Sequence, residues 1–238
     1  MKKYFLITTF ALAALSANAQ TATTDPGVVI NDVKWATRNV DAPGTFAAKP
    51  EDPGMLYQWN RKTAWSATNP GLGIVIGEAG GWDTTIPTGN TWEKANDPSP
   101  AGWKVPTLDD IKKLLDNDKV ENKEWTDENG VYGRKFTDKA SGNSLFLPAV
   151  GSRFYAYGTL NFAGEFGYYW SNAPIPVGVG DMYESRESYN PDRATITTTA
   201  VDGTYELYQS YNLFFFYNGV GYESNSRRVG RSVRSVAE

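Results

Sequence analysis

The chain has 238 residues, of which 40% are hydrophobic and 14% aromatic, with a formal net charge of −4; this composition predicts a loop-rich globular fold and argues against disorder. It contains no histidine and no cysteine, which excludes Ser-His-Asp and Cys-His catalysis and removes the usual ligands of zinc, haem and iron–sulfur clusters. Only oxygen-ligated ions such as calcium stay open, and the acidic balance argues against a nucleic-acid partner.

The first predicted element is a signal peptide at 1–19. Lys2 and Lys3 precede an apolar run at 4–15 that is too short to span a bilayer, and Ala17-Asn18-Ala19 forms a small-residue cleavage site. We therefore expect an exported protein that is secreted, periplasmic or at the cell surface. No cysteine follows the cleavage site, which excludes a lipoprotein, and no later stretch predicts a transmembrane segment.

A lead-in segment at 20–32 is followed by short strands and loops. Residues 28–30 and 33–40 predict a hairpin that turns at Asn31-Asp32, with Trp35 on one face. The next predicted elements are a proline–glycine loop at 41–54, a short apolar–aromatic element at 55–59, and a region at 66–100 that is mostly loop around the apolar run 74–76.

The segment 97–107 is stiff, because its three prolines fix φ and lack a backbone N–H. Thr107 is the predicted N-cap of the one clear helix, at about 107–117, and Asp110 completes a capping box. Leucine and isoleucine recur at helical spacing along this segment and form one apolar stripe.

The remainder of the chain predicts mostly β structure. We interpret 121–130 as an acidic turn region, because 127–130 is rich in turn-forming residues. Strands are expected at 144–148, 151–157 and 167–170, a hairpin between 211–217 and 220–222 through Asn218-Gly219, and a last strand at 229–236. We interpret the arginines near the C-terminus mostly as a solvated strand face; they are Arg227, Arg228, Arg231 and Arg234.

Six motifs follow one another across residues 33–236. They are Trp35-Ala36-Thr37-Arg38-Asn39-Val40, Gly54-Met55-Leu56-Tyr57-Gln58-Trp59, the segment 97–107 with its helix, Phe146-Leu147-Pro148-Ala149-Val150-Gly151 with Arg153, Gly167-Tyr168-Tyr169-Trp170-Ser171, and Gly230-Arg231-Ser232-Val233-Arg234-Ser235-Val236. In this order they resemble the Fibrobacter succinogenes major paralogous domain, a family common in exported proteins of Bacteroidetes.

The resemblance implies a single domain at 33–238 with an α+β, C-type-lectin-like fold that is loop-rich, mostly antiparallel β, and has paired termini. Similar folds occur in formylglycine-generating enzymes, in histidine-ligated iron oxygenases and in receptor-binding proteins diversified by retroelements. The first two chemistries need cysteine or histidine, which this chain lacks. Of the functions found on similar folds, the resemblance therefore implies binding, by analogy of fold.

The chain departs from the family pattern in two places. Relatives usually carry cysteine where Ser99 and Ser235 stand, so the resemblance implies that these positions form a pair with Cα atoms within about 7 Å. The second departure is an insertion at about 172–206, which we expect on the loop-rich side of the fold where ligands bind.

The candidate ligand-binding residues come from the insertion and the last hairpin, where tyrosine, asparagine and charge are typical of an adaptable recognition surface. They are Tyr183, Arg186, Tyr189, Asn190, Tyr211, Tyr217, Asn218, Tyr222 and Asn225. Acidic residues of the insertion could bind calcium, although neither the twelve-residue calcium loop nor the Glu-Pro-Asn triplet of calcium lectins is present. We assign no catalytic residue and no metal ligand.

The eight tryptophans divide into two groups. Those inside the motifs are interpreted as core residues (Trp35, Trp59, Trp103 and Trp170), and those outside them as better candidates for stacking on sugars (Trp65, Trp82, Trp92 and Trp125).

The first hypothesis for function is a non-enzymatic exported domain that binds a glycan or a surface protein. A structural or assembly component of a surface appendage or matrix is the alternative, and a carboxylate-dependent hydrolase is a remote one. The sequence leaves open the oligomeric state, the ligand, and whether a retroelement diversifies the last hairpin.

Overall fold

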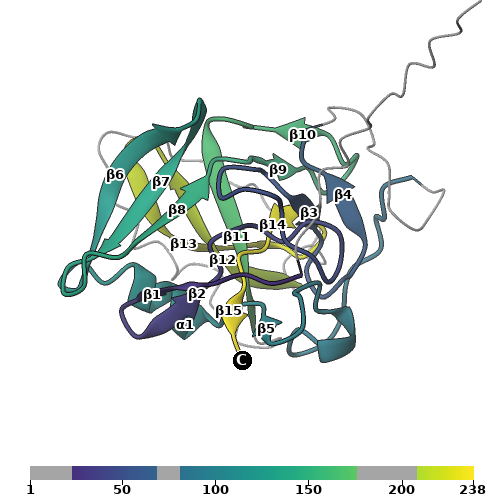
Figure 1. Ribbon diagram of the computed structural model, residues 1–238. Coiled ribbons are helices and arrows are strands. Elements are labelled where there is room, and N and C mark those ends of the chain that lie inside the picture. The colour runs from purple at the N-terminus through teal and green to yellow at the C-terminus, as the bar shows by residue number, and fades with distance from the viewer. Residues whose placement is uncertain (1–22, 69–80, 176–207) are drawn as a thin grey trace, which may run out of the picture.

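The computed structural model describes residues 23–68, 81–175 and 208–238 (Figure 1). The predicted signal peptide, the apolar run 74–76 and most of the insertion lie outside the described residues. Four insertion residues proposed to bind ligand are among them: Tyr183, Arg186, Tyr189 and Asn190.

The largest sheet has six strands in the order β13-β12-β11-β14-β3-β4. All neighbours in it are antiparallel except β11 and β14, which run parallel. The strands are β3 (Met55–Tyr57), β4 (Ala64–Ser66), β11 (Phe166–Pro174), β12 (Gln209–Phe216), β13 (Gly219–Ser226) and β14 (Arg231–Ser232). The expected hairpin at the end of the chain is therefore confirmed as β12–β13.

Three smaller sheets surround this one. A four-stranded sheet has the order β1 (Val28–Ile30), β2 (Val33–Trp35), β15 (Val236–Ala237) and β5 (Trp103–Lys104). A three-stranded sheet consists of β6 (Val120–Glu128), β7 (Val131–Asp138) and β8 (Ser144–Pro148), and a two-stranded one of β9 (Ser152–Arg153) and β10 (Leu160–Asn161). Val236 pairs with Trp35, so the expected pairing of the two ends of the domain is confirmed.

The one α-helix of the described residues, α1 (Leu108–Leu114), begins as the sequence predicts. Thr107 Oγ1 accepts a hydrogen bond from the Asp110 N–H at 3.1 Å, and Asp110 Oδ2 accepts one from the Thr107 N–H at 2.9 Å, which confirms the capping box. The helix ends at Leu114, three residues before the expected end at 117, and Leu115 is its C-cap. A 3-10 turn, η1 (Lys94–Asn96), precedes it.

Three predicted boundaries in the second half of the chain are wrong. The acidic region 121–130 is mostly strand β6, and only Asn129-Gly130, with φ of 52° and 82°, forms the turn to β7. The strand expected at 151–157 is reduced to β9. The last strand, at 229–236, is two short strands in two different sheets, β14 and β15. Residues 121–128 form a strand in spite of their turn-forming composition, because pairing with a neighbouring strand outweighs local propensity.

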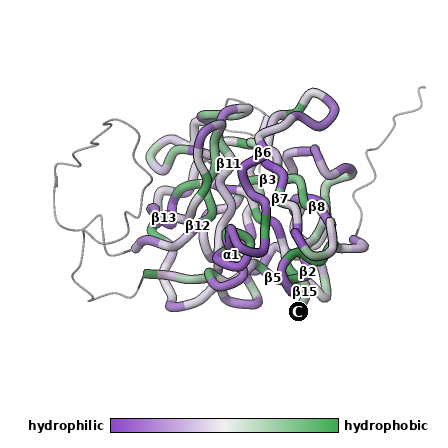
Figure 2. The backbone as a smooth tube through the Cα atoms, turned by 90° about the vertical axis from the view of Figure 1, so that its left-hand side faces the viewer, coloured by the Kyte–Doolittle hydropathy of each residue, from purple (hydrophilic) through white to green (hydrophobic). Residues whose placement is uncertain are grey.

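The core lies on both faces of the six-stranded sheet. One face packs Tyr169, Leu213 and Phe215 against α1, β1–β2 and β7–β8; Figure 2 shows the hydrophobic stretch of β12 that supplies two of them. The other face packs Trp59 and Trp170 in a second cluster.

The tryptophan predictions are half right. Trp35, Trp59 and Trp170 are buried core residues, as expected, and Trp103 is half-buried against Phe46. Three of the four proposed sugar-stacking residues are buried as well, so that interpretation is wrong for Trp65, Trp82 and Trp92. Trp65 lies on strand β4 and packs on Trp82, while the loop that carries Trp92 brings that ring against Trp59. Only Trp125 keeps an accessible face.

The interpretation of the C-terminal arginines as a solvated face is also wrong. Arg227, Arg231 and Arg234 are at most 2% exposed, and Arg228 is half-buried. The reason is topological: β14 and β15 lie in the interior of their sheets, so the segment that carries these residues runs through the middle of the fold.

The predicted proximity of Ser99 and Ser235 is confirmed by a direct contact. Ser235 Oγ donates to Ser99 Oγ at 2.8 Å, across 136 positions of sequence. The stiff segment 97–107 is thereby tied to the strand that ends the chain.

We expect the double variant Ser99→Cys/Ser235→Cys to form a disulfide on oxidation and to raise the free energy of unfolding by about 2–4 kcal/mol. The wild-type chain has no cysteine, so any disulfide is the engineered one. Chemical denaturation of the oxidised and reduced double variant measures the effect, with each single variant as a control. A double variant that retains two reactive thiols after oxidation would contradict the geometry.

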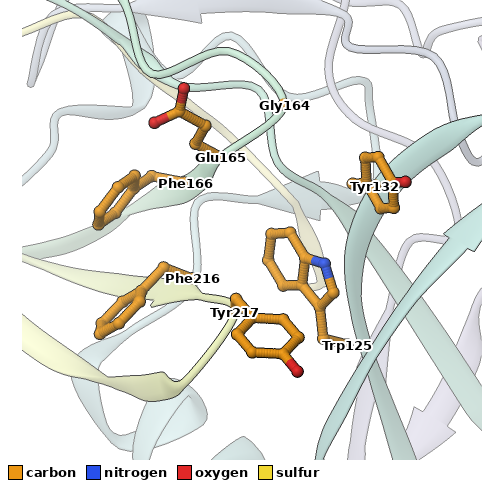
Figure 3. Close-up of a pocket in the computed structure, with 7 residues that line it drawn as sticks. All are labelled: Trp125, Tyr132, Gly164, Glu165, Phe166, Phe216 and Tyr217. Carbon is orange, nitrogen blue, oxygen red and sulfur yellow. The ribbon is translucent and has the colours of Figure 1, made fainter.

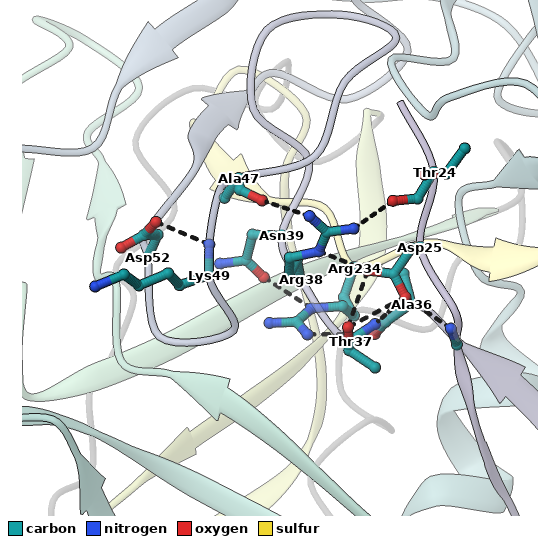
Figure 4. A network of polar contacts seen from close by, with 11 residues as sticks. Thr24, Asp25, Ala36, Thr37, Arg38, Asn39, Ala47, Lys49, Asp52 and Arg234 are labelled. Atoms are coloured by element: carbon teal, nitrogen blue, oxygen red, sulfur yellow. Dashed lines mark hydrogen bonds and ion pairs between the residues drawn. The ribbon is translucent and has the colours of Figure 1, made fainter. Parts of the chain in front are cut away.

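Asp25 fixes the start of the described chain to the end of β2 (Figure 4). Its carboxylate accepts from the N–H groups of Gly27 and Thr37 at 2.8 and 2.9 Å, and from Arg38 Nε at 2.9 Å. Arg38 continues the network to the carbonyls of Thr24 and Ala47. Burial raises the pKa of Asp25, but the hydrogen bonds outweigh it, and the pKa is lowered from its ordinary value.

A carboxyl group whose folded-state pKa is lowered stabilises the fold above its unfolded-state pKa of about 3.9, and that stability is lost as pH falls through the folded-state value. We therefore expect the variant Asp25→Asn to have a free energy of unfolding about 1–3 kcal/mol lower than wild type at neutral pH. When the pH is lowered below about 4, the free energy of unfolding should fall less in the variant than in wild type. Urea unfolding as a function of pH tests this, and parallel acid limbs in the two proteins would refute it.

Candidate functional site

A pocket of about 310 Å³ opens where β11 begins, where β12 ends, and beside the β6–β7 hairpin (Figure 3). Five of its lining residues are aromatic, and the sixth side chain is a carboxylate. The lining residues are Trp125, Tyr132, Gly164, Glu165, Phe166, Phe216 and Tyr217. Figure 3 shows Phe166 and Phe216 side by side, with Trp125 and Tyr132 across from them and Glu165 at the rim.

Strand pairing explains how residues from three parts of the chain meet here. Phe166 and Phe216 are directly paired partners of β11 and β12, and Tyr217 begins the turn to β13, which falls one residue earlier than the predicted Asn218-Gly219 because Phe216 pairs with Gly219. Gly164, with φ of 82°, turns the chain into β11 and donates its N–H to the Ala149 carbonyl at 2.7 Å.

Arg134 holds the β6–β7 hairpin against the rest of the pocket. Its guanidinium is 2% exposed and donates to the carbonyls of Asn122 at 2.7 Å, Phe216 at 2.5 Å and Tyr217 at 3.3 Å. Burial lowers the pKa of Arg134 to about 10, so the group stays protonated at neutral pH. It acts as a fixed bridge beneath the turn that carries Tyr217.

The rings on the hairpin side are arranged around Trp125. Tyr132 lies nearly parallel to it, with ring centroids 6.3 Å apart, and Tyr217 lies edge-on at 6.5 Å. Trp125 itself rests against the core ring of Phe215 at 6.4 Å. Tyr132 and Tyr217 are 54% and 68% exposed, so apolar ring surface faces the solvent on this side.

The pocket continues into a row of half-buried or exposed rings along β11 and β12. Neighbouring rings are nearly parallel within each strand, with interplanar angles of 5° on β11 and 10° on β12, and 28° between the two strands. The row consists of Phe162, Phe166, Tyr168, Phe214 and Phe216. It forms an aromatic surface that is continuous with the pocket, because Phe166 and Phe216 belong to both.

Two glycines of β13 make room for this row. A Cβ at Gly219 would lie 2.7 Å from the Phe216 ring, and one at Gly221 would lie 3.2 Å from the Phe214 ring. The rings therefore lie across the edge strand β13, where a side chain at either position would push them away. Glycine at an edge strand covered by a cross-strand aromatic ring is a known way to stabilise such an edge.

The last hairpin contributes its predicted binding residues to different places. Tyr217 lines the pocket and Asn218 follows it in the turn. Tyr211 and Tyr222 contact each other at 6.2 Å on the side that carries α1, where Lys112 lies 5.8 Å above the Tyr222 ring. Asn225 is half-buried opposite Ser210, at the far end of the hairpin.

Several residues that line the pocket are not among the ligand-binding residues predicted from the sequence. Trp125 was singled out as a candidate for stacking on sugars, but Tyr132, Glu165, Phe166 and Phe216 were not. The aromatic run at 214–217 was a visible signal. Which of its rings point outward became clear only from the pairing of β12 with β11.

Within residues 23–68, 81–175 and 208–238, no three carboxylates gather closely enough to hold a metal ion. No helix of these ranges is long and apolar enough to cross a membrane. The acidic residues proposed for calcium lie in the insertion, outside the described residues.

Comparisons with protein-family models, with curated proteins and with solved structures find no match to this chain. The site is therefore interpreted from its own residues and geometry.

We expect Arg134→Met to lower the free energy of unfolding by about 1–3 kcal/mol, because three backbone carbonyls, that of Asn122 buried, lose their donor. The total tryptophan emission, to which the partly accessible Trp125 contributes, should shift to longer wavelength as the hairpin loosens. The neighbouring variant Lys135→Met is the control: its ion pair with Glu124 spans 3.6 Å and is partly exposed, so we expect a change of at most about 1 kcal/mol. Equal effects in urea denaturation would rule out the bridging role of Arg134.

Proposed function

We propose that this protein is a non-enzymatic, exported binding domain that holds a glycan in the aromatic pocket. We also propose that it belongs to the Fibrobacter succinogenes major paralogous domain family and has a C-type-lectin-like fold. The mostly antiparallel β structure with one helix, the paired ends of the domain and the Ser99–Ser235 contact support this assignment.

The observation that carries the proposal is the exposed aromatic lining of the pocket. The C–H face of a pyranose ring is apolar, and aromatic side chains bind such faces by offering flat, poorly hydrated surface. The pocket volume of about 310 Å³ is at the small end of the range for small-molecule sites. Glu165 at the rim adds an acceptor for ligand hydroxyl groups.

The row of rings on β11 and β12 favours an oligosaccharide over a single sugar. It extends the apolar surface from the pocket along two strands, so that successive sugar units could each meet a ring. The row lies on a paired sheet, which holds it rigid, and rigid aromatic contacts lose little entropy on binding.

A hydrolase is supported less well by this geometry. Glycoside hydrolysis needs two carboxylates that face one another across the bound sugar, and among the described residues Glu165 is the only carboxylate that lines the pocket. An assembly component would use the same exposed rings for contacts between proteins, and light scattering at increasing concentration separates that role from glycan binding.

A glycan array followed by calorimetry on the best ligand tests the proposal. We expect Trp125→Ala to weaken binding at least about tenfold, equivalent to about 1.4 kcal/mol, because the central ring of the pocket is lost. The matched control is Tyr222→Ala, which removes an accessible tyrosine outside the pocket, on the side of the β12–β13 hairpin that carries α1, and should leave affinity unchanged. Absence of binding by the folded wild-type protein across the array would contradict the proposal.

A further inference from the structure

We propose that the pocket selects a cationic glycan, one whose sugars carry free protonated amino groups. This inference rests on the proposed function and specifies its ligand class. It is carried by the aromatic pocket, by the charges around it and by the absence, within the part of the chain that the structure describes, of a cation over the rings of Trp125, Tyr132 and Tyr217.

The charge presented at the pocket is negative. Glu165 lines it directly and is exposed. Asp127 is also exposed; it is the paired partner of Tyr132 across β6 and β7 and lies two residues from Trp125 on the same strand, so it shares their face. Neither carboxylate forms an ion pair with a lysine or arginine of the described residues.

The positive charges nearby are turned away from the ligand. Arg134 shares the face of Trp125, but its guanidinium is buried beneath the pocket and occupied by three backbone carbonyls. Lys135 lies on the opposite face of β7 and pairs with Glu124. A bound ammonium group would therefore meet Glu165 in the pocket, with Asp127 exposed beside Tyr132, and neither Arg134 nor Lys135 presents its charge there.

The rings of the pocket are also not covered by lysine or arginine side chains of the described ranges. Elsewhere the protein covers its aromatic faces with guanidinium groups: Arg227 lies 4.2 Å from the Trp59 ring and Arg231 5.1 Å from the Trp170 ring. Among the described residues, no lysine or arginine lies over Trp125, Tyr132 or Tyr217. These electron-rich faces, next to carboxylates, are the arrangement that binds an ammonium group by cation–π attraction.

The test compares two probes that differ in charge and share a sugar backbone: glucosamine oligomers and N-acetylglucosamine oligomers of equal length, at a pH where the free amines are protonated. We expect the glucosamine oligomer to bind about three- to tenfold more tightly. Added salt should reduce this preference, because exposed charges are screened.

The double variant Asp127→Asn/Glu165→Gln should abolish the preference, so that the two oligomers bind with equal affinity. Its control is Asp109→Asn/Glu124→Gln, which changes the net charge equally at two exposed positions, one on α1 and one on the other face of β6, and should keep the preference.

The two proposals fail differently. Equal affinity for both oligomers, or tighter binding of the acetylated one, overturns the cationic selectivity and leaves glycan binding standing. Binding of neither oligomer overturns the selectivity as well, and together with an empty glycan array it overturns the proposed function. Binding of a lysine oligomer in the absence of binding to either glycan assigns the pocket to basic peptides and rejects both proposals.

Discussion

The rest of the fold depends on the contacts that the buried guanidinium groups near the C-terminus make. Arg231 lies between the rings of Tyr168 and Trp170 and pairs with Glu223 at 3.3 Å. Arg234 donates to Asn39 Oδ1 at 2.9 Å and to the Ala36 carbonyl. Burying a charge is costly unless hydrogen bonds and counter-charges compensate, so the segment 227–236 can occupy the interior only with these partners in place. Through it, the first and last motifs of the chain become neighbours.

This arrangement determines where the protein can present a ligand site. The six-stranded sheet is covered on one side by α1 and the smaller sheets, and its other side is filled near β14 by Trp59 and Trp170. Away from β14, the rings of β11 and β12 lose that cover and reach the solvent. The pocket lies at this end, where Arg134 is again a buried guanidinium that donates hydrogen bonds to backbone carbonyls, here from two hairpins. The proposed site is thus an uncovered extension of the core, built on rigid strands.

The same chemistry separates structural aromatic residues from the proposed binding residues. Rings used for structure are stacked by arginines, buried by neighbouring tryptophans, or bonded through their N–H groups, as Trp170 Nε1 is to the Tyr57 carbonyl at 2.8 Å. Rings of the pocket keep exposed faces beside carboxylates. Charge and exposure, and not residue type, distinguish the two groups. For this reason only one of the eight tryptophans, Trp125, lines the pocket.

Features set by neighbouring residues could be read from the sequence. The turn at Asn31-Asp32, the capping box of Thr107 and Asp110, strand β8 and the last hairpin all follow from local propensity and hydrogen bonding. The family resemblance added one long-range contact, between Ser99 and Ser235. The burial of Arg227, Arg231 and Arg234, the strand at β6 and the pocket itself were decided by tertiary structure. Periodicity shows that a strand or helix has two different sides. Which side is covered depends on partners that are distant in the sequence, as Asn39 is from Arg234, and a charged side chain is buried only where such partners hydrogen-bond it.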